Sequence, residues 1–286
     1  MRSSGERAGV PQTVTMLGPV PSASLVHDPS REELELREYL GDGFSLTSLQ
    51  QSEARVDEEF AAAADEVSFY RESETYLYNL TSFAMTGTKL PYLEQLTALL
   101  EPGARVLDYG CGIGSDGLLL AELGYRVEFA DFANPSTEYL RWRLARRGLE
   151  APVHDLERHV PGGFDAAYSF DVIEHVPDPL GFLAELEQRS RLVAVNLLEP
   201  EPGDIDLHHD LPVAELREHA ARAGRVVGYR VYYDRSHLLI YESGEGAAPA
   251  TRFASRARIG AGRLRRRAER LRASGLYGGA SPGPPS

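Results

Sequence analysis

Apolar residues between positions 31 and 100 recur at steps of three and four, the spacing that places them on one face of an α-helix. The pattern predicts amphipathic helices at Arg31–Leu40, Leu46–Glu66, Thr75–Met85 and Leu90–Leu100. Pro91 falls in the first turn of the last helix, where proline is tolerated. The stretch before them, residues 1–30, is rich in Pro, Ser and Gly, and we expect it to be a flexible lead.

The pattern changes at Arg105, where short apolar runs begin to alternate with helical segments. This alternation is typical of βαβ units and a parallel sheet. Only Asp234–Ser236 separates the last two strands, so they must pair antiparallel as a hairpin. The expected fold is therefore α/β and Rossmann-like, with a seven-stranded sheet. The predicted strands are Arg105–Asp108, Arg126–Ala130, Ala151–Val153, Phe164–Phe170, Arg191–Leu197, Arg225–Tyr233 and His237–Tyr241.

The C-terminal segment differs from the rest of the chain in charge. From Gly246 onward it holds nine arginines against one acid, Glu269, and its apolar positions Phe253–Leu271 predict a basic amphipathic helix interrupted by Gly260 and Gly262. Such a helix can bind an anionic membrane, but we expect it to rest on the protein's own acidic body. The predicted organisation is a lead at 1–30, a helical lid at 31–100, a ligand-binding domain at 101–243 and a basic, partly disordered tail at 244–286.

Charge and composition exclude several kinds of protein. The whole chain carries −13, so residues 1–245 carry −21, and a body that negative repels phosphate backbones and argues against a nucleic-acid partner. The single cysteine, Cys111, rules out a disulfide framework. No run approaches the roughly 20 apolar residues of a membrane span, and Met1–Ser30 has no apolar signal core. We therefore expect a cytoplasmic protein.

A glycine-rich loop, Val106–Gly114, leaves the first predicted strand and enters the next helix. Glycines serve where the backbone turns sharply close to a ligand. The spacing Gly112-x-Gly114-x-x-Gly117 also fits a dinucleotide fingerprint. A pyrophosphate, however, would lie beside the carboxylate of Asp108, where like charges repel. A ligand with an ammonium and a sulfonium group would instead be attracted to Asp108.

This loop resembles motif I of the class I S-adenosylmethionine-dependent methyltransferases, an acid followed by x-G-x-G-x-G. The resemblance covers about Leu90 to Tyr241 and implies the seven-stranded methyltransferase sheet with S-adenosylmethionine as cofactor. It places the methionine part at Asp108 and the loop, the ribose at Asp131, the adenine at Phe132 and Asp155, and backbone contacts at Ser169 and Phe170. The implied cofactor-binding residues are Asp108, Gly110, Gly112, Gly114, Asp131, Phe132, Asp155, Ser169 and Phe170.

A tyrosine-rich segment at Tyr70–Asn79 suggests a lid over the cofactor, in which Tyr76 and Tyr78 meet the methionine carboxylate or the sulfonium. Packing of the predicted helices is the alternative explanation for these tyrosines. Thr86–Lys89 would be the hinge of the lid.

The candidate catalytic residues are His175, Glu174 and His208. A histidine beside a sulfonium can act as a general base, and Glu174 can orient it, although this dipeptide can equally cap the next helix. His208-His209-Asp210 also invites a metal site. Adjacent histidines point in different directions, however, and no matching third cluster is visible in the sequence, so we predict no metal.

The function implied is methyl transfer to a small molecule, since an enclosed site beneath a lid suits a metabolite. One alternative is an enzyme of the same fold that uses the aminocarboxypropyl arm of the cofactor and releases methylthioadenosine. A noncatalytic partner subunit that keeps the fold is the other. The intact Asp108, Asp131 and glycine loop count against the partner subunit.

Overall fold

The computed structural model describes residues 25–201, 208–244 and 246–277. Most of the predicted lead, most of the Pro200–Asp206 loop and Gly278–Ser286 lie outside this range. The helices before the sheet are α1 (Pro29–Leu40), α2 (Leu46–Gln50), α3 (Ser52–Ala62), α4 (Glu66–Glu72), α5 (Thr75–Thr86) and α6 (Leu90–Thr97), with a 3₁₀ turn η1 (Gly41–Gly43) after α1. The later helices are α7 (Ser115–Glu122), α8 (Pro135–Arg146), η2 (Ile173–His175), α9 (Pro179–Arg189), α10 (Val213–Ala223) and α11 (Pro249–Tyr277).

The strands form one seven-stranded sheet in the order β3-β2-β1-β4-β5-β7-β6. Strands β1 to β5 are parallel, and β7 pairs antiparallel with both β5 and β6. The predicted α/β architecture, with its parallel strands and terminal hairpin, is confirmed. The bounds are β1 (Arg105–Tyr109), β2 (Arg126–Asp131), β3 (Val153–Asp155), β4 (Phe164–Ser169), β5 (Ser190–Leu198), β6 (Arg225–Tyr232) and β7 (Ser236–Glu242).

The third strand lies two residues later than predicted. Val153 is the first residue of β3 and stands opposite Phe129 of β2. Pro152, inside the predicted strand, has no N–H to donate, and only its carbonyl accepts, from Phe129 N–H at 2.9 Å. Regular pairing therefore begins after the proline and extends to Asp155.

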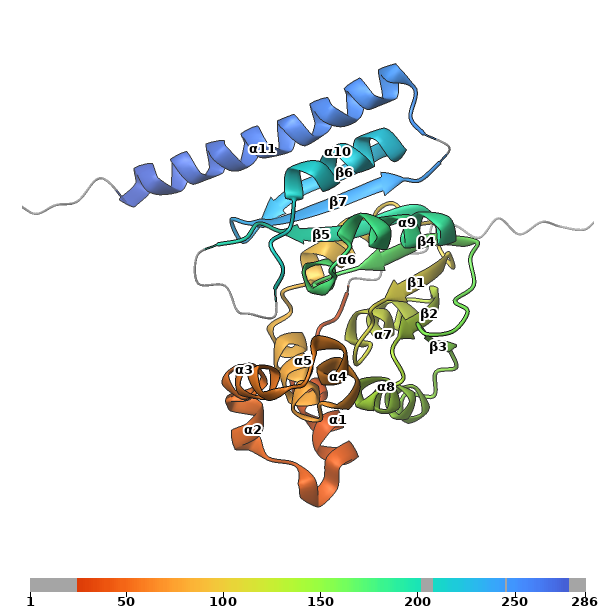
Figure 1. The fold of residues 1–286 in the computed structure, drawn as a ribbon, viewed down its shortest axis with the longest axis vertical. Helices are drawn as coiled ribbons and strands as arrows, with labels where there is room; N and C mark the ends of the chain where they lie inside the picture. The colour runs from red at the N-terminus through yellow and green to blue at the C-terminus, as the bar shows by residue number, and fades with distance from the viewer. Residues whose placement is uncertain (1–24, 202–207, 245, 278–286) are drawn as a thin grey trace, which may run out of the picture.

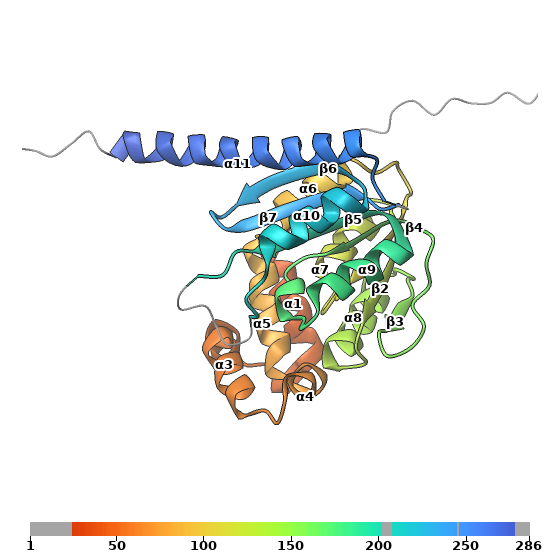
Figure 2. The same cartoon turned by 45° about the horizontal axis from the view of Figure 1, so that its top comes forward.

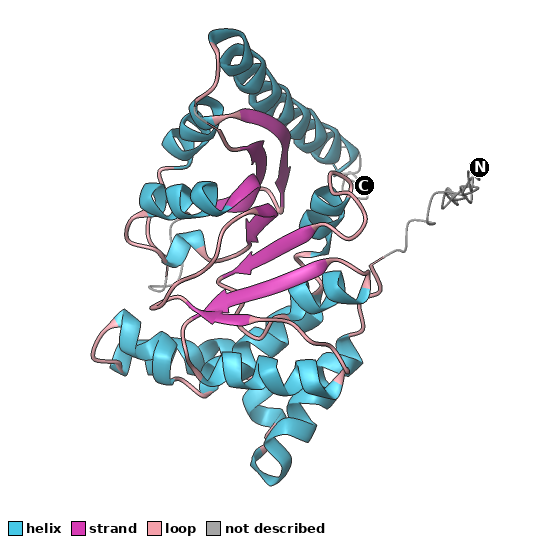
Figure 3. Cartoon of the chain, turned by 90° about the vertical axis from the view of Figure 1, so that its right-hand side faces the viewer, coloured by secondary structure: helices cyan, strands magenta, loops and turns pink. Residues whose placement is uncertain are grey.

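Helices cover both faces of the sheet (Figure 3). Along β1 the side chains alternate, as strand geometry requires. Val106 packs with the apolar side chains of α6, α7 and α8, and Leu107 packs with those of α9, α10 and α11. The two apolar layers enclose the sheet and leave its carboxyl edge open for a ligand.

The N-terminal helices α1 to α5 gather at one end of the molecule, beside α7 and α8 (Figure 1). The single helix predicted for Leu46–Glu66 is divided into α2, α3 and the start of α4. Gln51, with φ −110° and ψ 17°, leaves the helical conformation between α2 and α3. Asp65 then begins a new helix, because its side chain accepts the N–H of Ser68.

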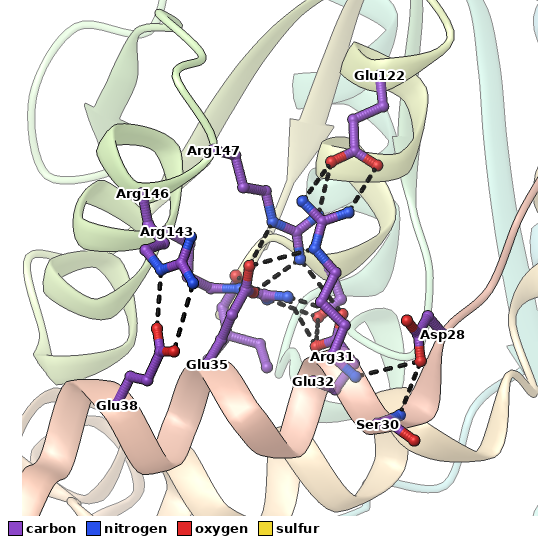
Figure 4. A network of polar contacts seen from close by, with 12 residues as sticks. Asp28, Ser30, Arg31, Glu32, Glu35, Glu38, Glu122, Arg143, Arg146 and Arg147 are labelled. Carbon is purple, nitrogen blue, oxygen red and sulfur yellow. Dashed lines mark hydrogen bonds and ion pairs between the residues drawn. The ribbon is translucent and has the colours of Figure 1, made fainter.

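A buried network of ion pairs holds α1 against α8 (Figure 4). Arg143 of α8 is 0% exposed. Its guanidinium donates to the carboxylates of Glu32 and Glu35 in α1 at 2.7–2.8 Å, and to the carbonyl of Ile113 at 2.8 Å. Arg147 also donates to both oxygens of Glu35, at 2.7 and 2.8 Å. The network therefore joins the N-terminal helices to α8 and to the glycine loop.

The basic segment folds as one helix, α11, which runs through Gly260 and Gly262 without interruption. It lies along β6 on the outside of the molecule (Figure 2). Ser255 is buried and accepts Val226 N–H of β6 at 3.0 Å, and Ile259 joins the apolar layer beneath. A Cβ on Gly262 would lie 2.5 Å from the Tyr229 ring, so glycine is needed for this close approach. In the described part of the chain, no helix combines the length and apolarity that crossing a membrane requires.

Candidate functional site

A cavity of about 370 Å³ opens at the carboxyl edge of the sheet, between the ends of β1, β2 and β4 and the helices α4 and α5. This size is within the usual range for small-ligand sites. The glycine loop and the segments after β2 and β4 form its floor. The predicted site residues that line it are Gly110, Gly112, Asp131, Phe132, Phe170, His175 and Tyr76.

The glycine loop turns sharply at Gly110, which has φ +76°, a conformation that favours glycine. A Cβ there would lie 2.8 Å from the Val172 side chain, so the loop passes close to the segment that follows β4. Gly112 also has positive φ, and its N–H donates to Asp131 at 2.7 Å. The loop is therefore tied to the end of β2, where the ribose was predicted to bind.

Asp131 holds both of its carboxylate oxygens in fixed positions. One accepts Gly112 N–H and the other accepts Phe132 N–H, each at 2.7 Å. Burial raises the pKa of Asp131 to about 6, against the lowering effect of these two hydrogen bonds. No cation pairs with it among the described contacts, so the carboxylate favours a ligand that donates hydrogen bonds.

Asp108 lies behind the loop and does not line the cavity. It is 4% exposed and accepts Gly117 N–H at 3.1 Å, which fixes the start of α7. Burial and the nearby charge of Asp116 raise the pKa of Asp108 to about 7. Its position supports the loop from below, so the predicted direct contact with the methionine part is not what this geometry shows.

Several other predicted residues lie away from the cavity. Tyr78 points to the N-terminal helices, where its hydroxyl accepts Ser45 N–H at 3.0 Å and donates to the Gly43 carbonyl at 3.2 Å. Ser169 is fully buried and donates to the Tyr109 carbonyl at 2.7 Å. Asp155 accepts Glu157 N–H in a turn. Gly114, like these three, is not part of the cavity wall, because it packs against Leu140.

The segment after β4 builds another part of the cavity wall. His175 lines it, and a hydrogen bond of 3.0 Å joins His175 Nδ1 to the Tyr70 hydroxyl of α4. The His208 ring lies 4.9 Å from the His175 ring, centroid to centroid. Glu174 is buried behind His175, and burial and the charge of Asp171 raise its pKa. The fold thus brings the three predicted catalytic residues together.

These three residues also form a possible metal-binding group. One ligand atom each from Glu174, His175 and His208 lie within 4.8 Å of one another. The sequence pattern had linked His208 to its neighbours His209 and Asp210 instead.

Three charged residues of the cavity wall were not among the predicted site residues: Asp171, Lys89 and Asp116. Asp171 has φ +57°, unusual for a residue other than glycine and frequent at functional sites. Its N–H donates to the Asn196 amide oxygen at 2.7 Å, and its carboxylate accepts from the Asn196 amide nitrogen at 2.6 Å. Lys89 forms a 2.9 Å ion pair with Asp116. Lys89 is the only lysine in the chain, which was a signal available in the sequence.

Comparison with known proteins assigns the central part of the chain. Residues 85–220 match the sequence model of a family described as a methyltransferase domain. These residues are a methyltransferase domain. The match confirms the family predicted from the glycine loop and, with the observed sheet order, the predicted fold. The cofactor of such a domain is S-adenosylmethionine, as predicted.

The chain is also similar to named proteins. It is 36% identical over 105 residues to a ubiquinone biosynthesis O-methyltransferase of Xanthomonas campestris pv. campestris, covering 35% of this chain and 43% of that protein. A protein of the same name from Bordetella parapertussis is 30% identical over 127 residues, covering 42% and 52%. The chain thus spans about half, or less, of the length of these relatives.

Among solved structures, the chain is similar to the 1,6-didemethyltoxoflavin-N1-methyltransferase of Burkholderia thailandensis. The two share 19% identity with a TM-score of 0.49, over 67% of this chain and 89% of the other. The magnesium protoporphyrin IX methyltransferase of Synechocystis gives a TM-score of 0.48 at 15% identity, over 74% and 97%.

Proposed function

We propose that this protein transfers the methyl group of S-adenosylmethionine to a small molecule held in the cavity at the carboxyl edge of its sheet. The observation that carries the proposal is the fixed carboxylate of Asp131 at the cavity wall. Each oxygen accepts one backbone N–H, and an ionised carboxylate has about four acceptor sites. It therefore keeps the capacity to accept the two adjacent hydroxyls of a ribose.

The remaining cavity residues fit the other parts of the cofactor. Phe132 offers an apolar ring for the adenine, beside Asp131. Asp171 and Lys89 supply opposite charges for the ammonium and carboxylate of the methionine part. The rings of Tyr70 and Tyr76, 5.5 Å apart at the wall, offer aromatic faces that attract a sulfonium cation.

The transfer itself needs only a correctly placed acceptor. The acceptor atom forms a bond to the methyl carbon, the carbon–sulfur bond breaks, and its electron pair remains on sulfur as S-adenosylhomocysteine. A neutral acceptor also loses a proton, which His175 can receive because it lines the cavity and Tyr70 orients its ring. Glu174 and His208, beside it, would complete the acid–base group.

The acceptor is proposed to be a small molecule that reacts through oxygen. A cavity of about 370 Å³ suits a metabolite. The relatives named ubiquinone biosynthesis O-methyltransferase support oxygen as the attacked atom. The predicted cytoplasmic location and the absence of a nucleic-acid partner remain predictions.

Product analysis tests this proposal. The purified full-length protein is incubated with S-adenosylmethionine, alone and with a panel of phenols and catechols, and the products are separated by mass spectrometry. We expect S-adenosylhomocysteine and a product heavier by one methyl group only when an acceptor is present. Methylthioadenosine formed above the spontaneous rate without acceptor would instead establish use of the aminocarboxypropyl arm. Neither product, despite cofactor binding, would favour the noncatalytic partner.

A further inference from the structure

Two segments far apart in sequence meet beside the cavity and bring three metal-ligand side chains together. Glu174 and His175 belong to η2, which follows β4, whereas His208 follows β5. One ligand atom from each lies within 4.8 Å of the other two. The His209 N–H donates to the Glu174 carbonyl at 2.7 Å, so a backbone hydrogen bond holds the two segments in this arrangement.

The burial of the Glu174 carboxylate is the second observation that favours a bound cation. Glu174 is 2% exposed, and its Oε2 is buried with no hydrogen-bond partner. Such an oxygen costs free energy unless something compensates for the water that it has lost. The charges of Lys89 and Arg235 reach Glu174, but neither side chain donates a hydrogen bond to Oε2, and Asp171 adds a like charge. A cation at Glu174 would satisfy this oxygen.

We propose that Glu174, His175 and His208 bind one divalent transition-metal cation. Two imidazoles and one carboxylate are a ligand set that holds zinc or iron and leaves coordination positions open. The Tyr70 hydroxyl bonds to His175 Nδ1 at 3.0 Å. This is the kind of outer contact that orients a ligating imidazole, so His175 Nε2 would face the ion.

The proposed ion adjoins the cavity, because His175 and its neighbours Val172 and Val176 line the wall. Open coordination positions on that side could receive an oxygen of the acceptor. A bound divalent cation lowers the pKa of a coordinated hydroxyl and helps to orient it. The role of the ion in binding the acceptor rests on the proposed function. It narrows the acceptor to molecules with oxygen atoms that can coordinate a cation, such as vicinal phenols, and Glu174, His175 and His208 then act through the ion.

Direct metal binding tests the site without any assay of activity. The full-length protein is freed of metal with a chelator and titrated with Zn²⁺ by calorimetry and with Mn²⁺ by electron paramagnetic resonance. We expect one ion per chain and a higher Tm in its presence. Glu174→Gln and His208→Ala should each weaken binding by roughly 10–100-fold or more, the range already seen when only an outer contact of a ligand is lost.

His209→Ala is the matched control, since His209 adjoins His208 but its ring is not part of the group. It should bind the ion as the wild type does. Absence of one-to-one binding by the wild type, or equal binding by the wild type and both ligand variants, would overturn the site. Product analysis keeps the two proposals apart. Methyl transfer by metal-free protein that binds no ion would leave the proposed function intact and His175 as the direct base. Metal binding without any methylated product would support the metal site and contradict the proposed methyl transfer.

Discussion

The molecule buries charged side chains in two regions, and these side chains are fully paired in one region but not in the other. Between α1 and α8, Arg143 is fully buried, yet carboxylates, a carbonyl and a hydroxyl accept from its guanidinium. At the cavity, Asp131 has only backbone partners, and Glu174 Oε2 has none. Buried charges that are fully paired hold elements together, whereas buried charges without a counter-charge are costly and are typical of ligand sites.

The pKa values follow this difference. Burial alone would raise the pKa of Glu35, but Arg147 and Arg143 lower it below its ordinary value. At the cavity wall and directly behind it no cation offsets burial to that extent, and the pKa values of Asp108, Asp131 and Glu174 rise. The first region is therefore complete by itself, and the second gains most from a ligand with positive charge or hydrogen-bond donors.

The largest expected effect is a loss of stability when an ion-pair partner between α1 and α8 is removed. Arg143→Met leaves Glu32 and Glu35 buried with fewer partners, and we expect the free energy of unfolding to fall by about 3–5 kcal/mol. Urea denaturation of the cofactor-free protein measures it. Arg146→Ala is the control, because Arg146 donates to Glu38 of the same helix pair but at the surface, and it should change stability little. Equal effects of the two substitutions would contradict the contrast between buried and surface pairs.

A smaller effect is expected in the pH dependence of ligand binding at the cavity. Because burial raises the pKa of Asp131 to about 6 in the folded protein, this group stabilises the ligand-free fold at low pH, and that contribution is lost as the pH rises through 6. A ligand that needs the ionised carboxylate should therefore bind more tightly as the pH rises. We expect about a tenfold gain in affinity for S-adenosylmethionine between pH 5 and 7. Over this range the ionised fraction of a group with a pKa of about 6 rises from roughly one tenth to roughly nine tenths.

Titration calorimetry at several pH values measures this dependence, and Asp131→Asn should flatten it. Affinity that falls across the same range would show that Asp131 binds the cofactor in its protonated form, or not at all.

The sequence predicted the sheet well because its signals are local. Alternation of short apolar runs with helices, and the three residues of Asp234–Ser236, were enough to predict parallel strands followed by an antiparallel hairpin. Whether a helix is interrupted depends on packing against residues far away in the chain, and this was harder to predict. The glycines of α11 looked like interruptions, but Gly262 is where the helix approaches Tyr229 of β6.

The site was predicted in part for the same reason. Glycines and acids at strand ends are read locally, and Gly110, Gly112 and Asp131 line the cavity. Tyr76 and Tyr78 are two residues apart on α5, about 200° around a helix, so only one of them can face the cavity. The meeting of His208 with His175, and the pairing of Arg143 with Glu32, join segments far apart in the chain. No local pattern contains them.

Calorimetric titration with S-adenosylmethionine at pH 7.5 tests the central claim most directly. We expect one-to-one binding by the wild type and a loss of about 2–3 kcal/mol in Asp131→Ala, the scale of hydrogen bonds to a charged group. Asp155→Ala is the matched control, because Asp155 ends the neighbouring strand without lining the cavity, and it should bind as the wild type does. Unchanged affinity in Asp131→Ala, or tight binding of NADH by the wild type, would contradict the account.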